Sequence, residues 1–128
     1  MKVLLIDDSR TMRNIQRSVL GQLGYTQIEE AGDGQEGLAK VASYEPDLVL
    51  LDWNMPVMDG MAFLAALRKQ GNKTPVIMVT TEAEKSRVIE AIKAGVNNYL
   101  VKPFTPEVLA ERIKQTLDRV KKPTTAAA

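Results

Sequence analysis

The sequence predicts an α/β fold in which five parallel strands form one sheet and each strand is followed by a helix. Four short runs rich in Val, Ile and Leu lack the alternation of half-exposed strands. They therefore predict strands buried on both faces, at residues 3–6, 48–51, 76–79 and 99–101. Between these runs the apolar residues recur at helical spacing. Right-handed crossovers would join the strands into a single sheet.

The first helix is predicted to follow the strand at residues 3–6. Met12, Ile15, Val19 and Leu23 recur at the spacing of one helical face. Gly24 stands where a helix commonly ends. We therefore expect this face to pack against the sheet.

The second strand is expected at residues 27–30, at the edge of the sheet, because Ile28 is its only apolar residue. Asp33 and Glu36 have the spacing of an N-terminal capping pair, which predicts the start of the second helix. That helix is expected to bury Leu38, Val41 and Ala42.

The remaining three helices are predicted from the same signals. The third ends near Gly71, the fourth ends at Gly95, and Thr105 with Pro106 begins the last. Their expected buried stripes are, in chain order, Phe63, Leu64 and Leu67, then Val88, Ile89 and Ile92, then Leu109, Ile113 and Leu117. We expect one domain over residues 1–122 and a flexible C-terminal tail over residues 123–128.

The composition is typical of a globular domain, with 45% hydrophobic residues, 26% charged residues and a net charge of +1. That charge gives no electrostatic reason to expect nucleic acid or a membrane surface as a partner. The chain has no cysteine and no histidine, which excludes disulfides, Cys-based metal sites, an imidazole general base and a phosphohistidine. The apolar run after Lys2 is too short for a signal peptide or a membrane span, so we expect a cytoplasmic location.

Polar residues collect where the predicted strands stop. In an open parallel sheet these strand ends share one edge, where ligands bind. For any single residue, a helix cap or a turn is the simpler explanation. For four strand ends together, capping does not require this mixture of charges. The residues concerned are Asp7 and Asp8, Asp52, Thr80 and Thr81, and Lys102.

Such a cluster is suited to phosphoryl transfer. Carboxylates about 4 Å apart repel by roughly 4 kcal/mol per pair at an effective dielectric constant of 20, so Asp7, Asp8 and Asp52 need a counter-ion such as Mg²⁺. Lys102 and Thr80 would add an ammonium and a hydroxyl group. Asp52 ends a strand of four successive apolar residues and is expected to be the most rigidly held, so we assign it as the nucleophile.

The motifs that carry these residues resemble those of two-component receiver domains. The likeness extends over residues 2–120 and is strongest to the CheY-type chemotaxis regulators. It implies a flavodoxin-like (βα)5 three-layer sandwich with a central sheet of order 2-1-3-4-5, an order that we take from the resemblance alone. The motifs are Asp7-Asp8-Ser9, Asp52 followed by Met55-Pro56 and Asp59-Gly60, Val79-Thr80, and Lys102-Pro103-Phe104.

The resemblance implies that a CheA-like histidine kinase phosphorylates Asp52 in the presence of Mg²⁺. Lys102 and Thr80 would bind the phosphoryl oxygens, and the Lys102–Pro103 bond would be cis. The implied metal ligands are Asp7, Asp8, Asp52 and the backbone carbonyl of Asn54. The chain has no Gly-rich loop ending in Lys-Ser or Lys-Thr, so we do not expect it to use ATP itself.

The resemblance also implies a conformational switch. Tyr99 matches the aromatic residue that moves when Thr80 turns toward the phosphoryl group, and Asn54 and Glu82 occupy positions that tune dephosphorylation. Thr81 departs from the small residue that the family usually has there, which puts the rates of transfer and hydrolysis in question. We expect the partner-binding face to include Lys85, Tyr99 and residues near Lys114.

The implied protein is a monomeric signalling protein rather than an enzyme. Its implied partners are the kinase, a phosphorylation-dependent target such as a flagellar motor switch protein, and a possible phosphatase. A regulator of another pathway, a phosphate sink and an inactive docking receiver are the alternatives within the family.

Two alternatives belong to other classes. Gly32, Gly34 and Gly37 spell the G-x-G-x-x-G pattern of nucleotide-binding Rossmann-like or flavodoxin-like proteins, but the preceding strand is acidic rather than apolar. A haloacid-dehalogenase-like phosphotransferase would carry its nucleophile after the first strand in a D-x-D pattern, whereas Asp7 and Asp8 are adjacent.

Overall fold

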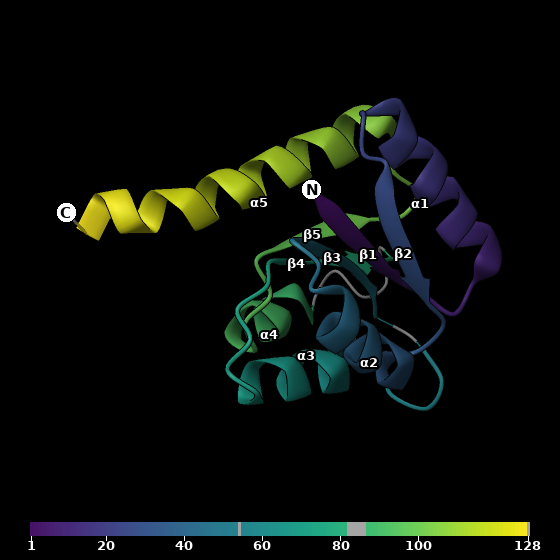
Figure 1. Ribbon diagram of the computed structural model, residues 1–128, viewed down its shortest axis with the longest axis horizontal. Helices are drawn as coiled ribbons and strands as arrows, with labels where there is room; N and C mark the ends of the chain where they lie inside the picture. Colours follow the sequence, from purple (N-terminus) through teal and green to yellow (C-terminus); the bar gives the residue numbers. More distant parts are fainter. Residues whose placement is uncertain (54, 82–86, 128) are drawn as a thin grey trace.

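A parallel sheet lies between two layers of helices in the computed structural model (Figure 1). The structure describes residues 1–53, 55–81 and 87–127, with the backbone alone over residues 120–127. The strands are β1 (Lys2–Ile6), β2 (Gln27–Ala31), β3 (Leu48–Asp52), β4 (Val76–Thr80) and β5 (Asn98–Val101). The helices are α1 (Arg10–Gln22), α2 (Gly34–Tyr44), α3 (Gly60–Lys69), α4 (Val88–Lys93) and α5 (Pro106–Ala127).

The strand order is β2-β1-β3-β4-β5, and every neighbouring pair is parallel. The predicted flavodoxin-like sandwich and its order 2-1-3-4-5 are therefore confirmed. Strand β2 lies at one edge of the sheet, as its sparse apolar content predicted. β1 and β3 are neighbours near the middle, so the ends that carry the predicted acids lie side by side.

Each face of the sheet carries its own hydrophobic core. Alternate residues of β1 point to opposite faces: Leu4 and Ile6 join the core under α2, α3 and α4, whereas Val3 and Leu5 join the core under α1 and α5. Figure 1 shows α1 and α5 on one side of the sheet and the other three helices on the opposite side. Burial on both faces explains why the strands read as unbroken apolar runs.

The predicted helix ends are confirmed where a capping signal was present. The Asp33 side chain accepts a hydrogen bond from the Glu36 N–H at 2.8 Å and begins α2. The Thr105 hydroxyl accepts one from the Val108 N–H at 3.2 Å and begins α5. Helix α5 runs on to Ala127, through most of the segment 123–128 in which we expect a flexible tail, and the domain boundary after residue 122 stays a prediction.

The predicted buried faces are wrong at four positions. Ile15 is 47% exposed, Ile89 67% and Ile92 54%, and Ala42 is also exposed. The buried face of α1 holds Gln16, Val19 and Leu20 instead, and that of α4 holds Val88 and Ala91. Periodicity predicted these helices correctly, but the face that meets the sheet is rotated from the one that the isoleucines indicate.

Charged residues on the edge strand β2 are paired with neighbouring helices. Glu30 forms ion pairs with Arg13 and Arg17 of α1, both at 2.8 Å, and Glu29 forms one with Lys40 of α2 at 3.0 Å. The acidic side chains of this strand are thus neutralised, while the strand itself is held by its pairing with β1 and by the buried side chains of Ile28 and Ala31.

Candidate functional site

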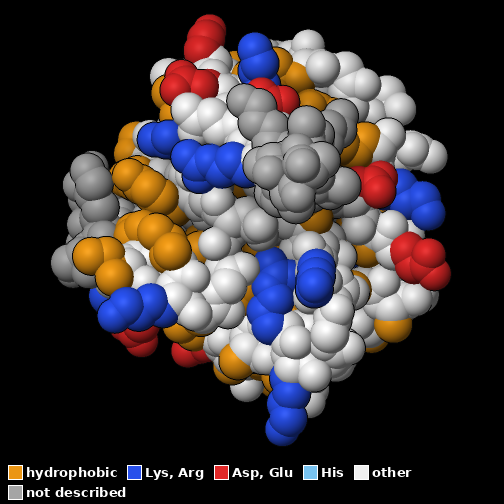
Figure 2. All heavy atoms as spheres, turned by 90° about the vertical axis from the view of Figure 1, so that its left-hand side faces the viewer, with side chains coloured by type: hydrophobic (Ala, Val, Ile, Leu, Met, Phe, Trp, Pro, Cys, Tyr) orange, Lys and Arg blue, Asp and Glu red, His pale blue; other side chains and the backbone are white. Residues whose placement is uncertain are grey.

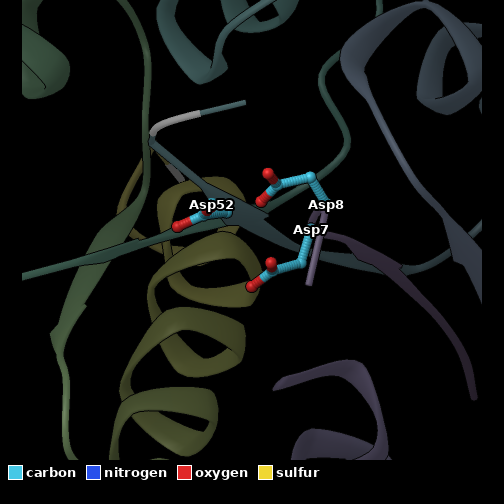
Figure 3. A group of neighbouring side chains, drawn as sticks. All are labelled: Asp7, Asp8 and Asp52. Carbon is cyan, nitrogen blue, oxygen red and sulfur yellow. The ribbon is translucent and has the colours of Figure 1, made fainter. Parts of the chain in front are cut away.

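Three carboxyl groups meet at the C-terminal edge of the sheet. Carboxylate oxygens of Asp7, Asp8 and Asp52 all lie within 4.8 Å of one another. Figure 3 shows Asp7 and Asp8 in the segment that follows β1, and Asp52 beside them at the end of β3. The structure thus brings Asp52 beside two acids that precede it by 44 and 45 positions in the sequence.

Backbone contacts fix two of these acids. Asp7 is 1% exposed, its N–H donates to the Ala31 carbonyl of β2 at 3.1 Å, and its Oδ1 accepts from the Ser9 N–H at 2.8 Å. Asp52 is 7% exposed and is the last residue of β3. The chain returns close behind it at Gly60, where a Cβ atom would lie 2.5 Å from the Asp52 carbonyl oxygen.

Lys102 supplies the positive charge of the site. Its Nζ donates to Asp52 Oδ1 at 2.9 Å and lies 3.9 Å from Asp7 Oδ2. Its own N–H donates to the Thr80 carbonyl at 2.7 Å, which fixes the end of β5 against the end of β4. The Lys102–Pro103 peptide bond is cis, as the resemblance implied.

Two buried oxygens of the site lack a hydrogen-bond partner among the residues that the structure describes: Thr80 Oγ1 and Asp7 Oδ2. Thr80 is 0% exposed and ends β4. Leaving a buried polar atom unpaired costs about 1–3 kcal/mol, so each of these two oxygens is available to a partner such as water, an ion or a ligand.

Burial makes the carboxyl groups of Asp52 and Asp7 harder to ionise. The pKa of the Asp52 carboxyl group is raised to about 6, mainly because burial removes water from it. Repulsion from Asp7 and Asp8 also raises this pKa, whereas the hydrogen bond from Lys102 lowers it. Burial likewise raises the pKa of Asp7, although the Ser9 N–H and Lys102 oppose the rise.

The donor set fits a hard divalent cation. Three carboxylates offer only oxygen ligands, and Asp7 Oδ2 has no hydrogen-bond partner in the described part of the chain. A cation there would offset the mutual repulsion that raises the two pKa values. The acidic cluster could therefore bind a metal ion such as Mg²⁺.

The other predicted site residues lie around this centre or outside the described residues. Tyr99 is half-buried on β5, and the Arg112 guanidinium carbon lies 5.2 Å from the centre of its ring. Thr81 is exposed directly after β4, and Lys114 is exposed on α5. The predicted roles of Asn54, Glu82 and Lys85 fall on residues outside the described ranges.

Two arginines that the motifs did not indicate also contact the site. Arg13 Nη1 donates to the Asp7 carbonyl at 2.5 Å. The Arg87 guanidinium carbon lies 4.5 Å from the centre of the ring of Trp53, which follows Asp52 and is 1% exposed. The first contact is made to a backbone carbonyl and the second joins residues that are far apart in the sequence, so no side-chain motif reveals either of them.

The glycines of the G-x-G-x-x-G pattern are explained by close packing. A Cβ atom on Gly34 would lie 2.7 Å from the Met58 carbonyl oxygen, and one on Gly37 would lie 2.6 Å from Ile6 Cδ1. Gly34 also donates its N–H to the Met58 carbonyl at 3.3 Å. These contacts bring α2 close to β1 and to the loop after β3, so the pattern needs no nucleotide to account for it.

The comparisons with known proteins give the family. Residues 3–114 match the model of the response regulator receiver domain. The chain therefore belongs to the response regulator receiver family, a class of signalling proteins rather than classical enzymes. Among the residues that the structure describes, no helix is long and apolar enough to cross a membrane.

Within that family the chain is CheY-like. It is 46% identical to chemotaxis protein CheY1 of Helicobacter pylori, over 91% of this chain and 97% of the relative. It is also 46% identical to chemotaxis protein CheY of Pseudomonas aeruginosa, over 94% and 98%. The solved structure of Vibrio cholerae CheY4 matches with a TM-score of 0.82 and 40% identity, covering 90% of this chain and 97% of that one.

Proposed function

We propose that this chain is a phosphorylation-activated chemotaxis regulator that accepts a phosphoryl group on Asp52. The observation that carries the proposal is the 2.9 Å contact between Lys102 Nζ and Asp52 Oδ1 beside the Asp7–Asp8 pair. This contact supports the proposal because a carboxylate that could act as a nucleophile lies beside an ammonium group and two further acids that could bind a cation.

In the proposed reaction an oxygen of Asp52 attacks the phosphorus of a phosphohistidine on a histidine kinase. The bond between phosphorus and the histidine nitrogen breaks, and the leaving imidazole takes a proton from solvent. Mg²⁺ bound by Asp7, Asp8, Asp52 and the Asn54 carbonyl would neutralise charge on the phosphoryl oxygens. Lys102 moves from the Asp52 carboxylate to a phosphoryl oxygen, because that group carries the greater charge.

The proposed switch begins at Thr80. Its hydroxyl, which has no hydrogen-bond partner among the described residues, can donate to a phosphoryl oxygen, and its rotation would leave space beside β5 that the Tyr99 ring can enter. Phosphorylation then favours one of two existing arrangements. Asn54 and Glu82 would tune the rate of dephosphorylation, with or without a separate phosphatase.

The proposed partner face includes α4, Tyr99 on β5, and the part of α5 near Lys114. Ile89 and Ile92 expose apolar side chains on α4, and Lys114 is exposed. Figure 2 views the molecule from the side of α4 and the far end of α5, and hydrophobic side chains gather there beside Lys and Arg. An apolar surface next to positive charge suits an amphipathic acidic segment, such as one on a cytoplasmic flagellar motor switch protein.

Mass spectrometry after incubation with acetyl phosphate and Mg²⁺ tests the phosphoryl transfer. We expect one phosphoryl adduct, mapped to Asp52, and none on Asp52→Asn. Labelled ATP alone should leave the protein unlabelled. An adduct on Asp7 or Asp8 would contradict this proposal and indicate a haloacid-dehalogenase-like phosphotransferase instead.

Binding of a motor switch segment to the beryllofluoride-treated protein tests the output. We expect Ile89→Ser and Tyr99→Ala to weaken binding while phosphorylation of Asp52 persists. An activated protein that does not bind the segment would indicate a regulator of another pathway or a phosphate sink.

A further inference from the structure

Arg13 connects three elements of the fold at the edge of the site. Its side chain is 17% exposed on α1. Its Nε donates to Glu30 Oε1 of β2 at 2.8 Å, and its Nη1 donates to the Asp7 carbonyl after β1 at 2.5 Å. The planar guanidinium group is thus held at two separate points, which a flexible lysine could not reproduce.

Glu30 orients the Arg13 guanidinium group and is itself held by Arg17. Its second oxygen accepts from Arg17 Nε at 2.8 Å, and Arg17 Nη2 donates to the Ile28 carbonyl at 3.2 Å. Burial raises the pKa of Glu30, but hydrogen bonds from Arg13 and Arg17 outweigh it and lower that pKa overall. Glu30 is therefore ionised near neutral pH and can orient Arg13.

The carbonyl that Arg13 holds belongs to the peptide joining Asp7 to Asp8. The orientation of that peptide sets the directions in which both side chains leave the backbone. The Asp7 side chain is fixed further by the Ser9 N–H at 2.8 Å. A rotation of this peptide would separate oxygens that now lie within 4.8 Å of one another.

We propose that Arg13, oriented by Glu30, is a positioning residue that sets the Mg²⁺ affinity of the Asp7–Asp8 pair. This inference rests on the proposed function, because it takes these acids to be metal ligands. Charge alone predicts the opposite effect, since a nearby guanidinium repels a divalent cation. The sign of the change in affinity therefore separates positioning from simple electrostatics.

Calorimetric titration of the full chain with Mg²⁺ tests the inference, comparing Arg13→Gln with Arg17→Gln. Each variant loses one positive charge and one ion pair to Glu30, but only the first loses the bond to the Asp7 carbonyl. We expect Arg13→Gln to bind Mg²⁺ about tenfold more weakly, since changes to groups that orient metal ligands typically cost about 10–100-fold. Arg17→Gln should stay within about twofold of wild type, because it leaves the acids in place.

Hydrogen exchange of the Ser9 amide without metal gives a second readout, because this N–H donates to Asp7 Oδ1. It should exchange faster in Arg13→Gln and not in Arg17→Gln. Arg13→Lys, which keeps the charge, replaces Arg13→Gln if the latter does not fold, and we expect it too to weaken Mg²⁺ binding.

Unchanged or tighter Mg²⁺ binding by the Arg13 variants would overturn the inference and leave the proposed function intact. Failure of the wild-type protein to bind Mg²⁺ or to be labelled at Asp52 would overturn the proposed function, and this inference with it.

Discussion

The Asp52 carboxyl group is buried beside two other acids, so its ionisation is linked to the stability of the fold. Its pKa rises from an ordinary value of 3.8 to about 6, mainly because burial removes water. Between about pH 4 and pH 6, the Asp52 carboxyl group is therefore protonated in the folded protein but ionised in the unfolded chain. Stability therefore falls as the pH rises through that interval.

Replacing Asp52 with Asn should remove this pH-dependent cost. Without metal, the free energy of unfolding of Asp52→Asn minus that of wild type should increase by about 2 kcal/mol from about pH 4 to about pH 7. Urea denaturation at a series of pH values measures the difference. Saturating Mg²⁺ should reduce it at neutral pH, because only the wild type has all three carboxylates. A difference that does not vary with pH would contradict the raised pKa of Asp52.

The residues at the strand ends could be predicted from the sequence because topology alone brings them together. Asp7, Asp52 and Thr80 each lie in or just after a strand that reads clearly as a strand. Arg13 could not be predicted in the same way. Its contacts depend on Glu30 of the edge strand and on a backbone carbonyl, and neither leaves a pattern in the chain near Arg13.

At the scale of the elements, the sequence predicted that each helix exists more reliably than it predicted which face of the helix is buried against the sheet. Capping residues at Asp33 and Thr105 marked helix starts that the structure confirms. Ile15 and Ile89 misled the choice of buried face, because apolar spacing does not reveal which of two adjacent stripes meets the sheet. The error at α4 falls on the face that we propose for partner binding, where exposed apolar residues have a use.

The close approach of α2 to β1 depends on a glycine. An alanine at Gly37 would place its Cβ 2.6 Å from Ile6 Cδ1 and 3.1 Å from Phe63 Cε1, so Gly37→Ala should destabilise the protein by about 1–3 kcal/mol through overpacking. Thermal and urea denaturation measure this change. Gly21→Ala is the matched control: it is also helical, and apart from its two chain neighbours and the backbone of its own helix no described atom lies within 4 Å of its added Cβ. We expect that substitution to stabilise α1 by about 0.5 kcal/mol.

At the scale of the whole molecule, the polar groups at the C-terminal ends of the strands differ in their hydrogen bonding from those at the N-terminal ends. The C-terminal end keeps buried carboxylates and a Thr80 hydroxyl without a hydrogen-bond partner in the described ranges. At the opposite edge, Arg68 of α3 donates to the carbonyls of Gly95, Asn72 and Thr74, and to the Asn97 side chain. Burial lowers the pKa of Arg68, and these hydrogen bonds stabilise the segments that lead into β4 and β5.

Arg68→Lys should therefore destabilise the protein without changing phosphorylation. A lysine has three donors and cannot reach all four acceptors, so we expect a loss of about 2 kcal/mol in the free energy of unfolding. The labelling of Asp52 by acetyl phosphate should stay at the wild-type level below the unfolding transition. Lys69→Gln, at the exposed neighbouring position, is the control and should change stability by less than about 0.5 kcal/mol. Slower labelling in Arg68→Lys would show that the two edges are coupled.

The chain contains one tryptophan, and it is the residue directly after Asp52. Trp53 is 1% exposed with the Arg87 guanidinium over its ring, so the emission of this indole depends on the immediate surroundings of Asp52. The protein consequently carries an intrinsic optical reporter beside its acidic cluster. If Asp52 accepts a phosphoryl group as we propose, cation binding and acyl phosphate formation should each change the emission of this one tryptophan, in unlabelled protein.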